Sequence, residues 1–274
     1  MFGRRHHPVE GLPPARTLST PTDTLVWAVG DVHGCADLLS TLVDAVLGDV
    51  ETRNASHAHL IFLGDYIDRG PDTKGVLRYL AALEERPGLS LHFLKGNHED
   101  RMQAFLADPA FGAGWSEFGG RETLASYGLQ PPGLSDGPDV WEAARDALAD
   151  VLTPQDQRFL AGLKLSVSVG DYFFVHAGAE PGVALDEQDA QQLMWIRRRF
   201  LEDPRPFDKI VVHGHTPSDA VFADHRRIGI DTGAYATGVL TGLRLDGEAR
   251  QILQTRRRGG RIDLQRSPLM GSVR

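Results

Sequence analysis

Six side chains that commonly bind divalent metal ions occur in five short motifs, each of which follows a run of apolar residues. The motifs read GDVHG, GDYIDRG, GNHED, HAG and GHT, and they begin at residues 30, 64, 96, 176 and 214. The metal-binding candidates in them are Asp31, His33, Asp65, Asn97, His176 and His215. Carboxylate oxygen, amide oxygen and imidazole nitrogen together suit hard to borderline divalent cations. One such motif would be weak evidence, but five of them predict a hydrolase with two metal ions that acts on phosphate esters.

The spacing of these side chains divides them between two metal ions. Asp31 and His33 lie two residues apart, so both can point the same way from an extended segment. Asp65 follows the next strand, and its carboxylate can bridge two cations held roughly 3.5–4 Å apart. We therefore predict one ion at these three residues and a second at Asp65, Asn97, His176 and His215. The ligand mixture favours Mn²⁺, with Fe or Zn²⁺ as alternatives, over Ca²⁺.

Each candidate ligand also has an ordinary structural explanation. A single Asp-x-His is usually a surface turn, and an Asp in a glycine-containing turn is often a cap. Asn97 alone could hold a left-handed turn. Turn chemistry does not require histidine at three separate strand ends, however. The joint occurrence of the motifs therefore favours a metal centre over the separate structural explanations.

His98 and Asp68 are the candidates for proton transfer. His98 adjoins the candidate ligand Asn97 but is not needed to complete the ligand set. An imidazole beside the metal ions, with a pKa near neutrality, is well placed to protonate a departing alkoxide. Asp68 lies three residues after Asp65 and could orient His98 and stabilise its charge. The structural alternative for Asp68 is an ion pair with its neighbour Arg69.

Arg69 and Arg197 are the candidates for binding the substrate phosphate, because a guanidinium fork matches two phosphate oxygens. The two arginines that follow Arg197 are better explained as a solvated face. In the predicted reaction a hydroxide that bridges the ions attacks phosphorus directly, and His98 protonates the leaving oxygen. The single cysteine, Cys35, has no Arg-rich phosphate loop after it, which argues against a cysteine nucleophile.

Strands and the helices that follow them must position these motifs. Apolar runs at 25–29, 60–63 and 89–94 each end before a glycine, and helical spacing of apolar residues follows each of them. This repeated order predicts parallel βαβ units with functional groups at the carboxyl ends of the strands. A second set of strands is predicted at 164–169, 172–175, 209–212, 220–222, 227–230, 239–245 and 250–253. The predicted fold is therefore α/β, a four-layer α/β/β/α sandwich in which the motifs converge between two sheets.

We predict a single domain, residues 23–255, with a loose segment at each end. Residues 1–22 are rich in Pro, Arg, His and Thr and are predicted to form a flexible arm. Residues 256–274 are predicted to form a flexible basic tail. Helix-like stretches broken by Gly, Pro and Ser at 111–163 predict a helical insertion over the site rather than a second domain.

Composition limits the classes of function. The net charge of −8 gives no general basic field for nucleic acid, although the segment from Arg256 carries six Arg against one Asp. One cysteine allows no intrachain disulfide, and no apolar signal core opens the chain. No run reaches the ~18–20 apolar residues of a membrane span. We expect a cytoplasmic enzyme of bacterial type, and the sequence indicates no oligomeric state.

The five motifs, in this order and at this spacing, resemble those of the phosphoprotein phosphatase family of metallophosphoesterases, especially its bacterial and phage branch. GDVHGC, GDYIDRG and GNHE together are highly specific to that family, and the resemblance covers residues 26–241. It implies a calcineurin-like sandwich, two divalent metal ions, the ligand set given above and the roles given to His98 and Asp68. In His213-Gly214-His215, it implies that the second histidine is the ligand.

Two further segments are interpreted through this resemblance. Trp195-Ile196-Arg197 resembles the Trp-x-Arg of bacterial and phage members. The segment 231–234, Asp-Thr-Gly-Ala, also recurs in that branch and is expected to shape a loop at the rim of the site. The chain lacks the Ser-Ala-Pro-Asn-Tyr segment of eukaryotic members, although Tyr235 stands where that tyrosine would. Binding of eukaryotic inhibitors and regulatory subunits is therefore not carried over.

The resemblance implies a metal-dependent phosphomonoesterase that dephosphorylates phosphoserine or phosphothreonine in proteins, or hydrolyses small phosphoesters. The alternative is a hydrolase of dinucleoside polyphosphates such as diadenosine tetraphosphate, because those bacterial enzymes share the scaffold. They typically have Asp where this chain has Glu99, and they often lack the complete Asp-Arg-Gly, so both differences favour the phosphatase. RNA binding through the Arg-rich tail is disfavoured by the acidic body. A catalytically inactive scaffold would have lost a ligand or His98, and none is lost.

Overall fold

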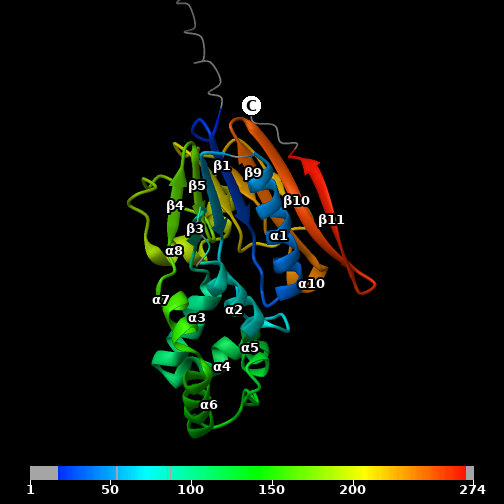
Figure 1. Cartoon of the computed structure of the whole chain (residues 1–274). Coiled ribbons are helices and arrows are strands. Elements are labelled where there is room, and N and C mark those ends of the chain that lie inside the picture. The colour runs from blue at the N-terminus through cyan, green and yellow to red at the C-terminus, as the bar shows by residue number, and fades with distance from the viewer. Residues whose placement is uncertain (1–17, 54, 85, 87, 270–274) are drawn as a thin grey trace, which may run out of the picture.

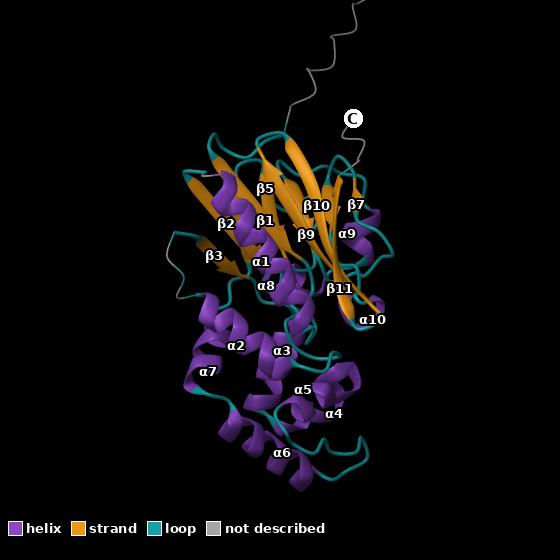
Figure 2. Cartoon of the chain, turned by 45° about the vertical axis from the view of Figure 1, so that its right-hand side comes forward, coloured by secondary structure: helices purple, strands orange, loops and turns teal. Residues whose placement is uncertain are grey.

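The computed structural model describes residues 18–53, 55–84, 86 and 88–269. These residues form two β-sheets with helices on their outer faces and a further group of helices below them (Figures 1 and 2). The strands are β1 (Thr24–Val29), β2 (His57–Phe62), β3 (Ser90–Phe93), β4 (Ser166–Val169), β5 (Tyr172–Val175), β6 (Ile210–His213), β7 (Phe222–Ala223), β8 (Arg227–Gly229), β9 (Val239–Asp246), β10 (Ala249–Arg258) and β11 (Arg261–Pro268).

The two sheets each contain a parallel core. The first has the strand order β11-β10-β9-β1-β2-β3 and the second has β4-β5-β6-β8-β7. Strands β1, β2 and β3 run parallel, as do β5, β6 and β8, and the other described pairs are antiparallel. Parallel neighbours present their carboxyl ends at one edge of a sheet. The sequence motifs emerge at this edge in both sheets.

The helices are α1 (Ala36–Arg53), α2 (Thr73–Leu83), α3 (Asn97–Ala107), η1 (Pro109–Phe111), α4 (Gly112–Trp115), the π-helical turn η2 (Ser116–Gly120), α5 (Arg121–Ser126), α6 (Pro138–Val151), α7 (Pro154–Ala161), α8 (Ala190–Trp195), α9 (Arg198–Glu202) and α10 (Ala234–Thr237). The elements from η1 to α7 occupy the stretch predicted as a helical insertion. Residues 109–161 are called the helical insertion below. No described helix has both the length and the apolar surface needed to cross a membrane.

Three apolar clusters separate the layers. Trp27 of β1 packs outward with buried residues of α1 and α2, while Ala28 faces the space between the sheets. Phe174 of β5 lies in the same inner cluster, and Phe173 packs outward with Phe200 of α9. Because both faces of these central strands are buried, their apolar runs are continuous rather than alternating. The predicted α/β/β/α sandwich is confirmed.

Two predicted strands belong to a different sheet from the one expected. The sequence analysis grouped 239–245 and 250–253 with the second set of strands, but β9 pairs antiparallel with β1 and β10 pairs with β9. Both therefore extend the first sheet. An apolar run identifies a strand, but it carries no information about which strand becomes its neighbour.

The basic segment from Arg256 is not the flexible tail that the sequence analysis predicted. Residues 256–258 complete β10, and β11 pairs with that strand from Arg258↔Arg261 to Gln251↔Pro268. Arg257 donates to the carboxylate of Asp37 in α1, so part of the positive charge is compensated within the fold. Residues 270–274 lie outside the described residues.

The predicted N-terminal arm is described only from residue 18, and residues 1–17 lie outside the described part of the chain. The backbone N–H of Thr20 donates to Gly247 O at 3.1 Å, and that of Ser19 donates to Asp171 Oδ2 at 3.0 Å. Thr20 itself is buried. Residues 18–22 therefore pack on the sandwich, and the domain begins before the predicted boundary at residue 23.

Candidate metal centre and active site

The carboxyl ends of strands from both sheets bring the predicted ligands together. Asp31 follows β1, Asp65 follows β2, His176 follows β5 and His215 follows β6, while Asn97 is the first residue of α3. The backbone N–H of His215 donates to Asp31 Oδ2 at 2.9 Å, although the two residues are 184 positions apart. All six predicted ligands, His33 included, are at most 6% exposed. The site is therefore a buried cluster built from distant parts of the chain.

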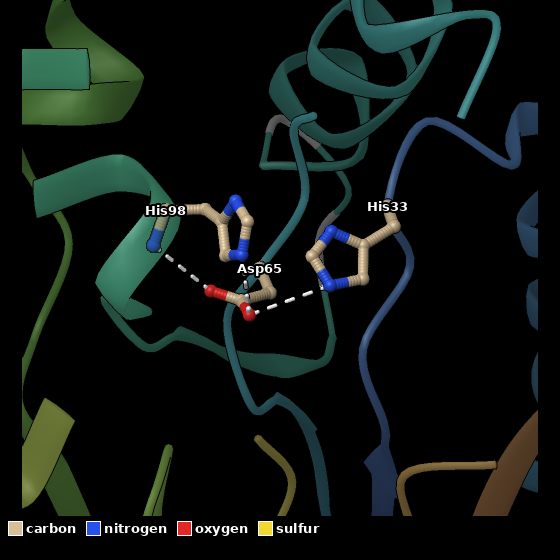
Figure 3. A group of neighbouring side chains, drawn as sticks. All are labelled: His33, Asp65 and His98. Atoms are coloured by element: carbon tan, nitrogen blue, oxygen red, sulfur yellow. Dashed lines mark hydrogen bonds and ion pairs between the residues drawn. The ribbon is translucent and has the colours of Figure 1, made fainter. Parts of the chain in front are cut away.

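Asp65 lies at the centre of this cluster (Figure 3). Its Oδ2 is 3.5 Å from His33 Nε2 and 3.8 Å from His98 Nε2. Its Oδ1 is 3.4 Å from His176 Nε2 and accepts a hydrogen bond from the backbone N–H of His98 at 3.1 Å. The two oxygens thus face different histidines. One carboxylate serves both halves of the site, which is the arrangement that a bridging ligand requires.

The second half of the site is formed by Asn97, His176 and His215. Asn97 Oδ1 lies 2.9 Å from His176 Nε2 and 2.7 Å from His215 Nδ1, and these two nitrogens are 3.2 Å apart. Two groups of donor atoms, each within 4.8 Å of one another, share Asp65: His33–Asp65–His98 and Asp65–His176–His215. The first group contains His98 where the sequence analysis placed Asp31.

The remaining ring nitrogens are held by hydrogen bonds. His33 and His176 each donate Nδ1–H to a backbone carbonyl at 2.8 Å, so the unprotonated Nε2 of each ring faces the site. His215 differs, because its Nε2 accepts a hydrogen bond from Arg197 Nε at 2.9 Å. In a neutral ring the proton then lies on Nδ1. Metal binding at Nδ1 therefore requires Arg197 to release His215.

Burial keeps these imidazoles uncharged. It lowers the pKa of His33 to about 3 and that of His215 to about 2, and it also lowers the pKa of His176. Neutral imidazole is the form that binds metal ions. Burial alone would raise the pKa of Asp65, but the surrounding histidines, above all His176, hold it below its ordinary value. The cluster therefore offers a carboxylate and neutral nitrogen donors.

Asp31 carries the clearest indication that a cation fits this site. Its Oδ1 is buried and accepts no hydrogen bond from any described residue. Burial and then the carboxylates of Asp231 and Asp65 raise the pKa of Asp31. An unpartnered carboxylate oxygen near two other buried carboxylates is costly without a compensating positive charge. The donor set and this uncompensated oxygen both fit a divalent metal ion.

Gly214 allows Asp31 to occupy this position. A Cβ added at Gly214 would lie 2.0 Å from Asp31 Oδ1. We expect Gly214→Ala to lower the unfolding free energy by about 1–3 kcal/mol, because the carboxylate must move. Urea denaturation in EDTA measures this effect without a contribution from metal ions.

Gly48→Ala is the matched control for that substitution. Gly48 lies inside α1, and a Cβ there would meet nothing within 4 Å. We expect this variant to gain about 0.5–1 kcal/mol, because alanine replaces glycine within a helix. Equal stability of the Gly214→Ala variant and the wild type would contradict the proposed crowding of Asp31.

His98 makes the contact with Asp68 on which the sequence analysis depended. Its Nδ1 donates to Asp68 Oδ2 at 2.8 Å, while its Nε2 faces Asp65. Burial would lower the pKa of His98, but the carboxylates of Asp65 and Asp68 outweigh it and raise the pKa above its ordinary value. Among the described residues no ion pair joins Asp68 to Arg69. The hydrogen bond at Nδ1 thus fixes the ring with its Nε2 toward Asp65.

Sequence reasoning missed the residues that fix Asp68. Trp115 Nε1 donates to Asp68 Oδ2 at 2.9 Å, and Thr123 Oγ1 donates to Asp68 Oδ1 at 2.7 Å. Both donors belong to the helical insertion. No local motif marks them, because Thr123 lies 55 positions from its partner. The helical insertion therefore does more than cover the site, since it anchors the residue that orients His98.

Glu99 has a structural role that the sequence analysis did not assign. Its carboxylate accepts the backbone N–H groups of Tyr66 at 2.8 Å, Gly96 at 2.9 Å and Asp65 at 3.0 Å. It is fully buried, and burial raises its pKa to about 7. Its place in the first turn of α3, two residues after Asn97, was the available signal. Glu99 thus fixes the loop that carries Asp65.

The two predicted phosphate-binding arginines lie on opposite sides of the cluster. Arg69 donates an N–H to Tyr235 OH at 2.9 Å, and its guanidinium carbon lies 4.9 Å from the centre of the Tyr235 ring. That tyrosine makes an edge contact with His33, with 5.2 Å between ring centres. Arg197 instead contacts His215 directly. Only Arg69 therefore leaves the metal ligands free in this arrangement.

A layered sandwich with buried carboxylate, amide and imidazole donors at its strand ends is the scaffold of a metal-dependent hydrolase. The sequence model of the calcineurin-like phosphoesterase family matches residues 24–246, and the chain belongs to this family. The family uses a dinuclear metal centre, and the two donor groups around Asp65 are its candidate here. The resemblance to phosphoprotein phosphatase-type metallophosphoesterases is thereby confirmed.

Named relatives of this chain act on dinucleotides. It is 26% identical over 235 residues to bis(5'-nucleosyl)-tetraphosphatase PrpE (asymmetrical) of Halalkalibacterium halodurans. The aligned region covers 79% of this chain and 88% of the relative. It is 31% identical over 160 residues to a symmetrical bis(5'-nucleosyl)-tetraphosphatase of Janthinobacterium sp. (strain Marseille). That aligned region covers 57% of this chain and 44% of the relative.

Solved structures share the fold of this chain. A protein thought to be a diadenosine tetraphosphatase has a TM-score of 0.57 and 19% identity, with 93% of this chain and all of that chain covered. A mutant of a cold-active protein tyrosine phosphatase has a TM-score of 0.59 and 17% identity, with 94% and 85% covered. At these identities the likeness establishes the architecture and leaves the substrate open.

Proposed function

We propose that this chain hydrolyses dinucleoside polyphosphates such as diadenosine tetraphosphate. The observation that carries the proposal is the similarity to asymmetrical bis(5'-nucleosyl)-tetraphosphatase along 79% of this chain and 88% of the relative. The helical insertion holds Asp68 through Trp115 and Thr123. The sequence analysis ranked this activity second, and the relatives raise it to first.

The proposed metal ligands are those predicted from the sequence, divided between two ions that share Asp65. They are Asp31, His33, Asp65, Asn97, His176 and His215. When bound, the ions supply positive charge that polarises the phosphoryl group and activates water. We propose Mn²⁺ as the metal, because the site mixes imidazole with carboxylate and amide oxygen.

The chain's own side chains then complete the reaction. His98 donates its Nε2 proton to the leaving oxygen, and Asp68 holds the ring in position through Nδ1. Arg69 binds phosphoryl oxygens, because its hydrogen bonds to Tyr235 OH and Phe118 O leave further N–H donors on the guanidinium. Arg197 can also bind phosphoryl oxygens only after its hydrogen bond to His215 is broken.

Hydrolysis of phosphoserine or phosphothreonine is the second candidate, which the sequence analysis ranked first. The complete Asp-Arg-Gly and the presence of Glu99 favoured it. However, the Glu99 carboxylate is occupied by backbone N–H groups and faces no open space. Glu99 therefore packs the loop, and the presence of Glu rather than Asp at this position gives no information about the substrate.

Parallel assays with diadenosine tetraphosphate and a phosphothreonine peptide, each with Mn²⁺, separate the two candidates. We expect the dinucleotide to be cleaved to mononucleotides with at least about tenfold higher kcat/KM than the peptide, a difference of about 1.4 kcal/mol in transition-state binding. Chromatography of the nucleotides and an assay of released phosphate are the measurements. Faster release of phosphate from the peptide would overturn the proposal in favour of the second candidate.

A further inference from the structure

A large pocket opens beside the candidate metal centre. Its volume is about 760 Å³, and its walls include Arg69, Ser116, Phe118, Arg121, Leu134 and Tyr235. We call this space the side pocket. Its walls come from the helical insertion, from Arg69 after β2 and from Tyr235 of α10. A volume within roughly 300–1,000 Å³ is typical of sites for small organic ligands.

The side pocket is physically joined to the candidate phosphate-binding residue. The backbone N–H of Arg69 donates to Gly119 O at 3.2 Å, and Arg69 Nε donates to Phe118 O at 3.4 Å. A Cβ at Gly119 would lie 2.6 Å from Arg69 N, so only glycine permits this approach. A phosphate on Arg69 would therefore sit at the mouth of the side pocket. Any group attached to that phosphate can enter it.

The walls of the side pocket expose apolar and aromatic surface. Phe118 and Leu134 are each 50% exposed, and Tyr235 is 38% exposed. Large apolar side chains are exposed at a cost, and when they cluster in a concave site they commonly contact a ligand. The guanidinium of Arg69 lies over one face of Tyr235, and that of Arg101 lies over one face of Phe118, so a flat ring can stack on the opposite face of either side chain. This surface fits a nucleobase better than it fits a charged chain.

A buried hydroxyl in the same pocket lacks a partner. Ser116 is 2% exposed, and its Oγ makes no hydrogen bond with any described residue. It begins the π-helical turn η2, an irregularity that is frequent at functional sites. An unsatisfied buried hydroxyl costs free energy that a polar group of a ligand can recover. A ribose or a base edge supplies such a group.

The charged residues that line the side pocket favour a neutral nucleoside over the phosphate chain. Glu117 and Glu122 also line the side pocket, so further phosphates would be repelled there. Arg121 also lines the side pocket and donates to Pro132 O at 3.0 Å, and its single positive charge offsets only one of these two carboxylates. Phosphate is therefore favoured at Arg69 and a neutral group is favoured inside.

We propose that the side pocket binds one nucleoside of the substrate, with its base stacked on Phe118. This inference rests on the proposed function, and it assigns to the helical insertion the recognition of the base. The phosphate chain then runs from the side pocket past Arg69 to the metal centre.

Phe118→Ala tests the proposal, with Phe111→Ala as the matched control. Phe111 is 48% exposed in the same helical insertion, and it does not line the side pocket. We expect Phe118→Ala to lower kcat/KM for diadenosine tetraphosphate about tenfold or more, since a stacked base contributes on that scale. Hydrolysis of glycerol 2-phosphate, which has no flat ring, should change less than about twofold. Phe111→Ala should leave both activities unchanged.

Competition by AMP tests nucleoside binding in the side pocket independently of the proposed function. AMP should inhibit p-nitrophenyl phosphate hydrolysis more strongly than inorganic phosphate does, and this advantage should disappear in Phe118→Ala. If the wild type shows that pattern without cleaving the dinucleotide, the side pocket stands and the proposed function fails. Dinucleotide cleavage unaffected by Phe118→Ala, or an equal loss with glycerol 2-phosphate, would overturn the side pocket as a nucleoside site. Stronger Phe118-dependent competition by a phosphopeptide would overturn it as well.

Discussion

Replacing His98 by asparagine should lower kcat for an alkyl phosphomonoester by about 10²- to 10⁴-fold, the range contributed by a well-placed general acid. The substitution removes the imidazole that Asp68 holds at 2.8 Å and that faces Asp65. It keeps the backbone N–H that donates to Asp65. Steady-state kinetics with Mn²⁺ measure the loss. Metal content per chain should stay at the wild-type value, because His98 is not among the proposed ligands.

The dependence on the leaving group separates proton transfer from other roles of His98. A p-nitrophenolate ion departs without a proton, whereas an alkoxide requires one. The His98→Asn variant should therefore lose more activity on an alkyl phosphomonoester than on p-nitrophenyl phosphate. An equal loss on both would contradict the acid role and leave only an electrostatic or structural one. His225→Asn, at an exposed position, is the control and should retain wild-type kinetics.

Local sequence was sufficient to predict the parts of the site that follow strands. A buried strand must end where its apolar run meets glycine, and the polar residues just beyond it share one edge of the sheet. Asp31 and Asp65 could therefore be placed near each other, and Asp65 does face two histidines.

Contacts set by tertiary packing could not be predicted in this way. Trp115 and Thr123 reach Asp68 only because the helical insertion folds back onto the loop after β2. The sheet that β9 joins is likewise decided by pairing with β1 and not by its own residues. Composition misled the prediction at β11, where arginine-rich sequence forms a strand because its partner β10 buries Leu253 and Thr255 against α1. Each of these depends on distant partners.

Replacing Asp65 by asparagine should remove the binding of both metal ions, and with it most of the activity. Both donor groups depend on Asp65, whose Oδ2 faces His33 and whose Oδ1 faces His176. Asparagine is neutral and offers one oxygen in place of two, so it cannot bridge two cations. We expect kcat/KM to fall on the order of 10³-fold or more, since a metal ion contributes several kcal/mol and each 1.4 kcal/mol is tenfold.

Metal content and thermal stability test this prediction without an activity assay. After dialysis against Mn²⁺, the wild type should retain two ions per chain and Asp65→Asn should retain fewer than one. Only the wild type and the exposed control Asp219→Asn should then gain stability on adding Mn²⁺. Two ions retained by Asp65→Asn, or a gain of stability with Mn²⁺ equal to that of the wild type, would contradict a bridging role.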